Sequence, residues 1–392
     1  MSDRLRASVQ SNSKVNFMIL IIVIIAAGLS QGLLLPVLSI LLEQKGISSS
    51  LNGLNAAALY IGSFGMTLIA ERVLGRVGFK KLIAGGISLV LVSLILFPLL
   101  PGIKVWFVLR LLVGIGDAAI HYAAQLWVLL MAPAQHRGRN ISLYGMSYGL
   151  GFSLGPLGIS LLRFGQATPF LVLAVLFLLV LVLAVTLLPN SRPDKVESGE
   201  SQTHRFGRCY RLAWFALIPA LLYGYMEASL NSNFPVYGLR IGYSTDQIAG
   251  LLPFVGIGGL LLQLPLGIWS DRFGRQKILI CAGIGGGLAF MLLPLAGSQF
   301  WLTLMLLMVA GGLVGSFFSL GLSLAADLLP RNLLPAANVV SSFHFNVGSI
   351  IGPGIGGLLL QMGFGGGIFA LMGALYILFG LLGLLFSPRH KF

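Results

Sequence analysis

Apolar runs recur along the whole of this sequence, and their length constrains the fold more than any other feature. The hydrocarbon core of a bilayer is roughly 30 Å thick, which an α-helix of about 20 residues crosses. A soluble protein could bury such runs only in helices that also carry a polar face. Only 9% of the residues are charged, against about 25% in a soluble domain. The sequence therefore predicts an all-α membrane protein.

The apolar runs predict twelve transmembrane helices. Several runs are longer than the minimum for one crossing, which a tilted helix accommodates. Because twelve is an even number, both termini are expected on the same side of the membrane. The predicted spans are residues 17–42, 50–74, 81–101, 103–131, 141–163, 167–189, 211–237, 246–269, 277–296, 299–328, 333–361 and 363–386.

Lysine and arginine are distributed unevenly over the connections between these spans. With a cytoplasmic N-terminus, 20 of them fall on the cytoplasmic side and four outside. This agrees with the positive-inside rule, so we expect a multi-pass protein of the inner (cytoplasmic) membrane with both termini cytoplasmic. The same distribution accounts for the net charge of +14 without a nucleic-acid partner. The four outside are Lys45, Lys104, Arg163 and Arg240, and the remaining one, Arg110, lies within a span. The cytoplasmic set is Arg4, Arg6, Lys14, Arg72, Arg76, Lys80, Lys81, Arg137, Arg139, Arg192, Lys195, Arg205, Arg208, Arg211, Arg272, Arg275, Lys277, Arg331, Arg389 and Lys391.

The long polar stretch 190–210 divides the chain into two halves of six predicted helices, 1–189 and 211–392. It is charged and is expected to be a cytoplasmic linker. The halves resemble each other: Gly155-Pro156 recurs as Gly352-Pro353, and Gly114 recurs as Gly311, each 197 residues on. A repeated bundle joined by a linker is typical of carriers that expose one site alternately to the two sides of the membrane.

Motifs in both halves resemble those of the major facilitator superfamily. The loop after the eighth span matches the family signature G-x-x-x-D-R-x-G-R-x-[KR], through Gly267, Asp271, Arg272, Gly274, Arg275 and Lys277. Its first-half copy, which includes Gly78 and Lys80, has Gly75 where the family has Asp. The fourth span carries R-x-x-x-G-x-G from Arg110, similar to the family's embedded-arginine motif. The resemblance implies two pseudo-symmetric six-helix bundles.

Glycine motifs extend the resemblance to the fifth and eleventh spans. The eleventh resembles the family motif associated with antiporters, which the family usually carries in the fifth, where this chain has Ile159-Ser160 in place of Gly-Gly. The resemblance points to the bacterial drug-efflux-like branch. Small residues let helix backbones approach closely, and packing alone is the simpler explanation of the set. Its members are Gly151, Gly155, Pro156, Gly348, Gly352, Pro353, Gly356 and Gly357.

By the same resemblance, the basic loop of the second half is a gate. Asp271 would accept hydrogen bonds from a facing helix N-terminus and from Arg272 or Arg275. The alternative is a solvated charge cluster that only sets the topology. The first-half copy, with Gly78 and Lys80, would form the equivalent gate.

The fourth span places four polar residues along one stripe. Arg110, Asp117 and His121 stand at i, i+7 and i+11, and Gln125 follows at i+15. Charged groups within a membrane are costly, so a stripe of them is expected to face a water-filled cavity. The alternative is an Arg110–Asp117 pair that only joins helices. We predict Asp117 and His121 as candidates for proton coupling.

Glu227 lies midway along the seventh span, with Tyr223 and Asn231 on the same helix face. Burial disfavours the charged form of a carboxyl group, which makes Glu227 the other candidate proton carrier. Further residues predicted to line the cavity are Arg110, Gln31, Gln125, Gln263, His344 and Asn346.

These features favour a proton-coupled exporter (antiporter) of lipophilic or amphipathic compounds, expected to be a monomer in the lipid bilayer with a small-molecule substrate. A proton symporter for uptake of a small organic solute and a lipid flippase are the alternatives. The chain holds no H-E-x-x-H or Walker sequence, so neither a metalloprotease nor ATP-driven pumping is expected. We expect no enzyme activity, cofactor or metal.

Overall fold

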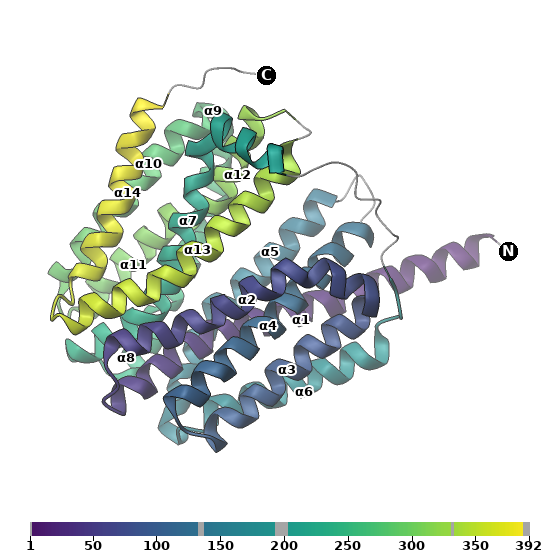
Figure 1. Ribbon diagram of the computed structural model, residues 1–392, viewed down its shortest axis with the longest axis horizontal. Helices are drawn as coiled ribbons and strands as arrows, with labels where there is room; N and C mark the ends of the chain where they lie inside the picture. The colour runs from purple at the N-terminus through teal and green to yellow at the C-terminus, as the bar shows by residue number, and fades with distance from the viewer. Residues whose placement is uncertain (1, 132–136, 193–202, 331–332, 387–392) are drawn as a thin grey trace. The chain divides into compact units, whose positions relative to one another are not determined.

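The computed structural model of this protein describes residues 2–131, 137–192, 203–330 and 333–386, and these ranges are helical with short connections (Figure 1). Part of the predicted linker, 193–202, lies outside the described residues. So do Lys195, Arg331, Arg389 and Lys391 of the predicted cytoplasmic set.

The helices form twelve successive segments, because α8 and α9, and α11 and α12, each make one span, while η2 and η3 extend α5 and α10. The predicted all-α fold is therefore confirmed. Within the part of the chain that the structure describes, ten spans are long and apolar enough to cross a membrane, and α4 and α5 are not among those ten. The elements are α1 Ser2–Gln44, α2 Ser49–Val77, α3 Phe79–Leu99, α4 Ile103–Met131, α5 Arg137–Leu154, η2 Gly155–Phe164, α6 Thr168–Leu187, α7 Thr203–Arg240, α8 Thr245–Leu251, α9 Pro253–Phe273, α10 Arg275–Leu292, η3 Leu293–Ala296, α11 Phe300–Val314, α12 Phe317–Leu328, α13 Leu334–Gln361 and α14 Gly367–Leu385.

Two compact units share these helices. Unit 1 comprises residues 1–34 and 58–196, and unit 2 comprises residues 35–57 and 197–392. The boundary at 196 falls within the predicted linker. The hairpin 35–57, which joins the end of α1 to the start of α2, belongs to unit 2 although it lies in the first half of the sequence.

Unit 1 is assembled by glycines at which helix backbones touch. A Cβ atom on Gly32 of α1 would lie 2.2 Å from the Phe152 carbonyl oxygen of α5, and one on Gly151 of α5 would lie 2.3 Å from the Ile25 carbonyl oxygen of α1. The pair α2 and α4 meets in the same way, where a Cβ atom on Gly62 would lie 2.1 Å from the Leu111 carbonyl oxygen. The predicted packing glycines of this half therefore lie at helix crossings.

Unit 2 repeats these crossings. Gly348 and Gly352 bring α13 against α7, where added Cβ atoms would lie 2.1 Å from the Leu221 and 2.6 Å from the Tyr225 carbonyl oxygens. Gly311, the counterpart of Gly114, brings α11 against α9. The predicted glycines Gly356 and Gly357 are equally crowded, the former by Asn233 and Ser229.

The two Gly-Pro copies differ in local structure. Pro156 stands at the start of the 3-10 helix η2, which ends α5. Pro353 lies inside the uninterrupted helix α13. Proline removes one backbone donor from a helix. In unit 1 the α-helix changes to a 3-10 helix at this point, whereas in unit 2 the α-helix continues through the proline.

Apolar side chains cover the outer surface of these helices. Leu385 is 82%, Leu295 79% and Trp301 73% exposed. The exposure of large apolar groups from several helices is the arrangement that a hydrocarbon environment requires.

We predict that Gly62→Ala destabilises the protein by roughly 1–3 kcal/mol, because the added methyl group has no room between α2 and α4. The measurement is the melting temperature of the purified protein in detergent. Gly65→Ala, less than one turn further along α2, is the matched control, because nothing lies within 4 Å of its Cβ position. Equal melting temperatures for the two variants would contradict the prediction.

Candidate functional site

A buried polar network in unit 1 joins α1, α4 and α5. The Gln31 side-chain amide donates a hydrogen bond to Oδ2 of Asp117, and the Tyr148 hydroxyl donates to Oε1 of Gln31 at 2.7 Å. His121 Nε2 lies 3.9 Å from the same Asp117 oxygen. Asp117 and Gln31 are only 3% and 7% exposed. Gln31, predicted from the first span, therefore lies together with Asp117 and His121, which were predicted from the stripe of the fourth span.

His121 is a partly accessible member of this network, with 25% of its side chain exposed. Its Nδ1 lies 2.7 Å from the Tyr144 hydroxyl, and its ring meets the Tyr148 ring edge-on at 4.7 Å. The network therefore places one partly exposed imidazole ring next to one buried carboxyl group.

Helix crossing explains why these side chains meet. Gln31 lies between Gly28 and Gly32, the two glycines at which α1 touches the backbone of α5 at Tyr148 and Phe152. Tyr144 and Tyr148 were not predicted as site residues. Their spacing of four residues on an otherwise glycine-rich and serine-rich helix is the signal that could have found them.

The rest of the predicted stripe does not join the network. Arg110 is 1% exposed and lies within electrostatic reach of Tyr60 of α2. Asp117 pairs with Gln31 and His121 among the described residues, and not with Arg110. Gln125 is exposed. A stripe predicted from helical spacing is thus divided among three environments.

A second buried carboxyl group lies in unit 2. Glu227 of α7 is 5% exposed, and its side chain interacts with the Tyr223 hydroxyl one turn earlier. Oε1 of Glu227 has no hydrogen-bond partner among the described residues. Tyr376 of α14 lies close enough to interact electrostatically with Glu227, and its hydroxyl donates to the Leu222 carbonyl oxygen at 3.1 Å.

The other residues predicted to line the cavity of unit 2 are bonded to neighbouring groups. His344 Nδ1 lies 3.0 Å from the Leu217 carbonyl oxygen and must donate to it, so Nε2 accepts from the Tyr210 hydroxyl at 2.6 Å. The amides of Asn231 and Asn346 donate to carbonyl oxygens one turn back on their own helices. Gln263 is exposed on α9.

The basic loop of the second half forms an ion-pair cluster at the α9–α10 turn. Arg275 donates to Asp271 and to Asp327, each at 3.1 Å, and to the Ser323 carbonyl oxygen. Gly274 provides the turn with φ 99°, a conformation that favours glycine. Arg272 stacks over its neighbour Phe273 instead.

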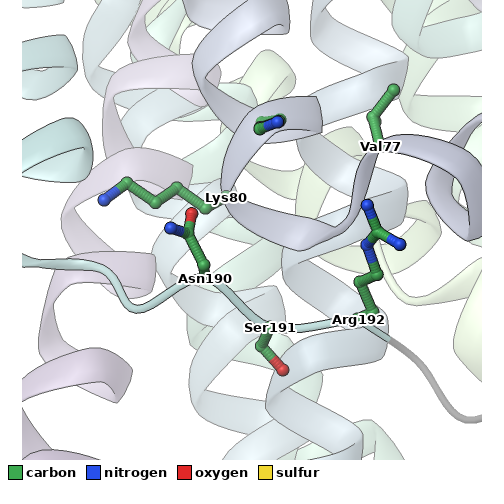
Figure 2. A pocket seen from close by; sticks show the side chains of 6 residues that line it. Val77, Lys80, Asn190, Ser191 and Arg192 are labelled. Carbon is green, nitrogen blue, oxygen red and sulfur yellow. The ribbon is translucent and has the colours of Figure 1, made fainter.

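The first-half copy of this loop borders a basic pocket of about 430 Å³, whose lining residues are Val77, Lys80, Lys81, Asn190, Ser191 and Arg192 (Figure 2). Gly78 turns the chain with φ 85°, and the next backbone amide donates to the Ser191 carbonyl oxygen at 3.0 Å. In Figure 2 the side chain of Lys80 extends to the left and that of Arg192 extends upward. The positive groups therefore surround the pocket without converging on one point.

Two pentapeptides of the form G-x-S-x-G, at 145–149 and 151–155, lie in the fifth span. In hydrolases such a sequence holds a nucleophilic serine on a sharp turn between a strand and a helix. Here Ser147 and Ser153 lie inside α5 and donate to the Leu143 and Gly149 carbonyl oxygens. Neither serine has the geometry of a nucleophile.

Helices that expose apolar side chains and bury carboxyl, histidine and amide groups define a multi-pass membrane protein of the transporter class. The model of the Major Facilitator Superfamily matches residues 20–260 and 209–392. The chain belongs to this superfamily, and it is a secondary transporter, not an enzyme.

Individual relatives agree with this assignment. The chain is 41% identical over 352 residues to the uncharacterized MFS-type transporter YfkF of Bacillus subtilis (strain 168), covering 89% of this chain and 90% of the relative. It is 24% identical over 373 residues to Multidrug resistance protein 2 of the same organism, covering 90% of each. The fold is similar to a crystal structure of the nucleoside transporter NupG, with a TM-score of 0.75, 14% identity, and coverage of 95% of this chain and 98% of that one.

We predict that Gln31→Leu lowers stability by about 1–3 kcal/mol, because it leaves the buried Asp117 carboxyl group without its donor and Tyr148 without its acceptor. The melting temperature in detergent measures the effect. Gln125→Leu makes the same chemical change on an exposed part of α4 and should melt like the unaltered protein. The prediction fails if the two leucine variants melt together.

Proposed function

We propose that this protein is a proton-coupled exporter of lipophilic or amphipathic compounds, working by alternating access in the cytoplasmic membrane. The observation that carries this proposal is that each unit buries one carboxyl group within its helices, Asp117 in unit 1 and Glu227 in unit 2. Both positions are deep enough for a change of protonation to matter to the conformation that holds them.

The surroundings of the two carboxyl groups assign them different roles. Asp117 accepts a hydrogen bond from Gln31 and lies near His121. Glu227 keeps one buried oxygen without a hydrogen-bond partner among the described residues. An unsolvated carboxylate oxygen is costly, so binding a proton relieves that cost. We therefore infer that Glu227 is the principal proton carrier.

Aromatic groups next to the polar ones support a lipophilic cargo. In unit 1 the ring of Tyr148 contacts both His121 and Phe152. In unit 2 the ring of Tyr223, which interacts with Glu227, stacks on Phe345 at 6.0 Å. A surface of apolar rings with few polar groups suits compounds with a large apolar body. The similarity to Multidrug resistance protein 2 supports export as the direction.

We predict that Glu227→Gln abolishes transport coupled to a proton gradient and leaves the amount of folded protein in the membrane unchanged. Glutamine keeps the size of the side chain but cannot bind and release a proton. The measurement uses everted membrane vesicles acidified inside and a panel of lipophilic dyes. An exporter accumulates dye as protons leave, whereas an uptake symporter carries dye out with them.

Glu71→Gln is the matched control, because Glu71 is an exposed carboxyl group near the end of α2. Its flux should equal that of the unaltered protein. Coupled flux in Glu227→Gln equal to that of the control would exclude Glu227 as the carrier. Loss of dye from acidified vesicles would overturn the direction that we propose.

A further inference from the structure

Arg240 connects four helix ends of unit 2. It is the last residue of α7, and its Nε donates to Oε1 of Glu43 at the end of α1, at 2.8 Å. Its Nη2 donates to the Ser49 hydroxyl at the start of α2, at 2.5 Å. Its Nη1 donates to the Leu360 carbonyl oxygen at the end of α13, at 2.7 Å.

These contacts are stronger than those of an ordinary surface ion pair. An isolated exposed pair contributes little to stability. Here one planar guanidinium group binds three acceptors on three different segments, and its rigid geometry limits the entropy lost in each bond. It also donates to the Leu360 carbonyl oxygen near the end of α13, which accepts from the Gly363 backbone amide as well. Glu43 lies at the negative end of the α1 dipole, where a carboxylate is unfavourable without a nearby cation.

Close backbone contact holds the same hairpin 35–57 against α13. A Cβ atom on Gly53 would lie 2.1 Å from the Pro353 carbonyl oxygen, and one on Gly357 would lie 2.3 Å from the Ser49 carbonyl oxygen. Within the hairpin, the Asn52 amide donates to the Ser39 carbonyl oxygen at 2.8 Å. The hairpin is thus held together by its own hydrogen bond and packs closely on α13.

The division of α1 and α2 between units gives these contacts a consequence for function. Both helices pass from unit 1 to unit 2 along their length, α1 after Leu34 and α2 before Ala58. Access from the end of the molecule that holds Arg240 requires the hairpin 35–57 to separate from α7 and α13. That separation breaks the bonds of Arg240 to Glu43 and Ser49, whereas the bond to the Leu360 carbonyl oxygen joins α7 to α13 and is kept.

We propose that Arg240 is the clamp that keeps this end closed, with Glu43 and Ser49 of the hairpin as the acceptors that it holds. The Leu360 carbonyl oxygen of α13 positions its guanidinium group. Arg240 is a positioning residue: it holds the hairpin and does not touch the transported compound. The proposal rests on alternating access in the proposed function. It adds a residue that sets the population of the closed state, on the side that the charge distribution predicts to be extracellular.

The test measures the accessibility of Ser39, which is fully buried in the hairpin and bonded through its hydroxyl to its own helix. Ser39→Cys is introduced after replacement of the two native cysteines by Cys209→Ala and Cys281→Ala. The rate of labelling by a membrane-impermeant maleimide is then followed in right-side-out and everted vesicles. Labelling needs no substrate, so a failure to find transported compounds leaves this test intact.

We predict that Arg240→Gln raises the labelling rate from one side only, by about tenfold, as the loss of charge-assisted hydrogen bonds implies. Glu43→Gln, which is nearly isosteric, should raise it by less, because Ser49 of the hairpin still binds Arg240. Lys104→Gln is the matched control: Lys104 is an exposed cation on the same predicted side, and its removal should change nothing.

The charge exchange separates a clamp from a folding defect. Arg240→Glu alone should label fast, and the double variant Arg240→Glu with Glu43→Arg should label more slowly because the ion pair is restored. Labelling in both Arg240→Gln and Glu43→Gln at the rate of Lys104→Gln would overturn the proposal. A double variant that labels as fast as Arg240→Glu would overturn it too.

Discussion

Contact between helix backbones at glycine is the interaction on which the rest of this structure depends. Lipid tails are as apolar as leucine, so helices in a bilayer gain little from burying leucine against one another. Close packing must hold them, and it is closest where a side chain is missing. Gly32 and Gly151 join α1 to α5, and Gly348 and Gly352 join α13 to α7. The polar groups of each unit lie beside these crossings.

The same crossings make buried polar groups possible. Gln31 reaches both Asp117 and Tyr148 because the neighbouring glycines bring α1 against α5. In unit 2 the crossing of α7 and α13 lies next to Glu227, one of whose oxygens has no hydrogen-bond partner among the described residues. One half therefore gives its carboxyl group an amide donor from another helix, while the other leaves one carboxyl oxygen without a hydrogen-bond partner among the described residues. That asymmetry between two similar halves is the basis of the function we propose.

Asymmetry also appears at the two basic loops. In the second half Arg275 is held by Asp271 and Asp327. In the first half glycine stands at position 75, where Asp271 would have its counterpart, and the basic residues border an open pocket instead. The repeat thus preserves the helix crossings, which packing requires, while the charged loops have diverged.

The sequence by itself determined the twelve helical segments, the glycines at the crossings and the buried acids, because each follows from length, composition or spacing along one helix. It could not determine which side chains meet. The spacing of Arg110, Asp117 and His121 predicted a single polar stripe on one face of the fourth span. In the structure Arg110 lies near Tyr60, whereas Asp117 and His121 contact residues of α1 and α5. Tyr144 as a partner of His121, and Arg240 as a partner of Glu43, depend on helices that the sequence does not place side by side. Only the tertiary structure decided these pairs, because the rotation and depth of each helix are set by its neighbours and not by its own sequence.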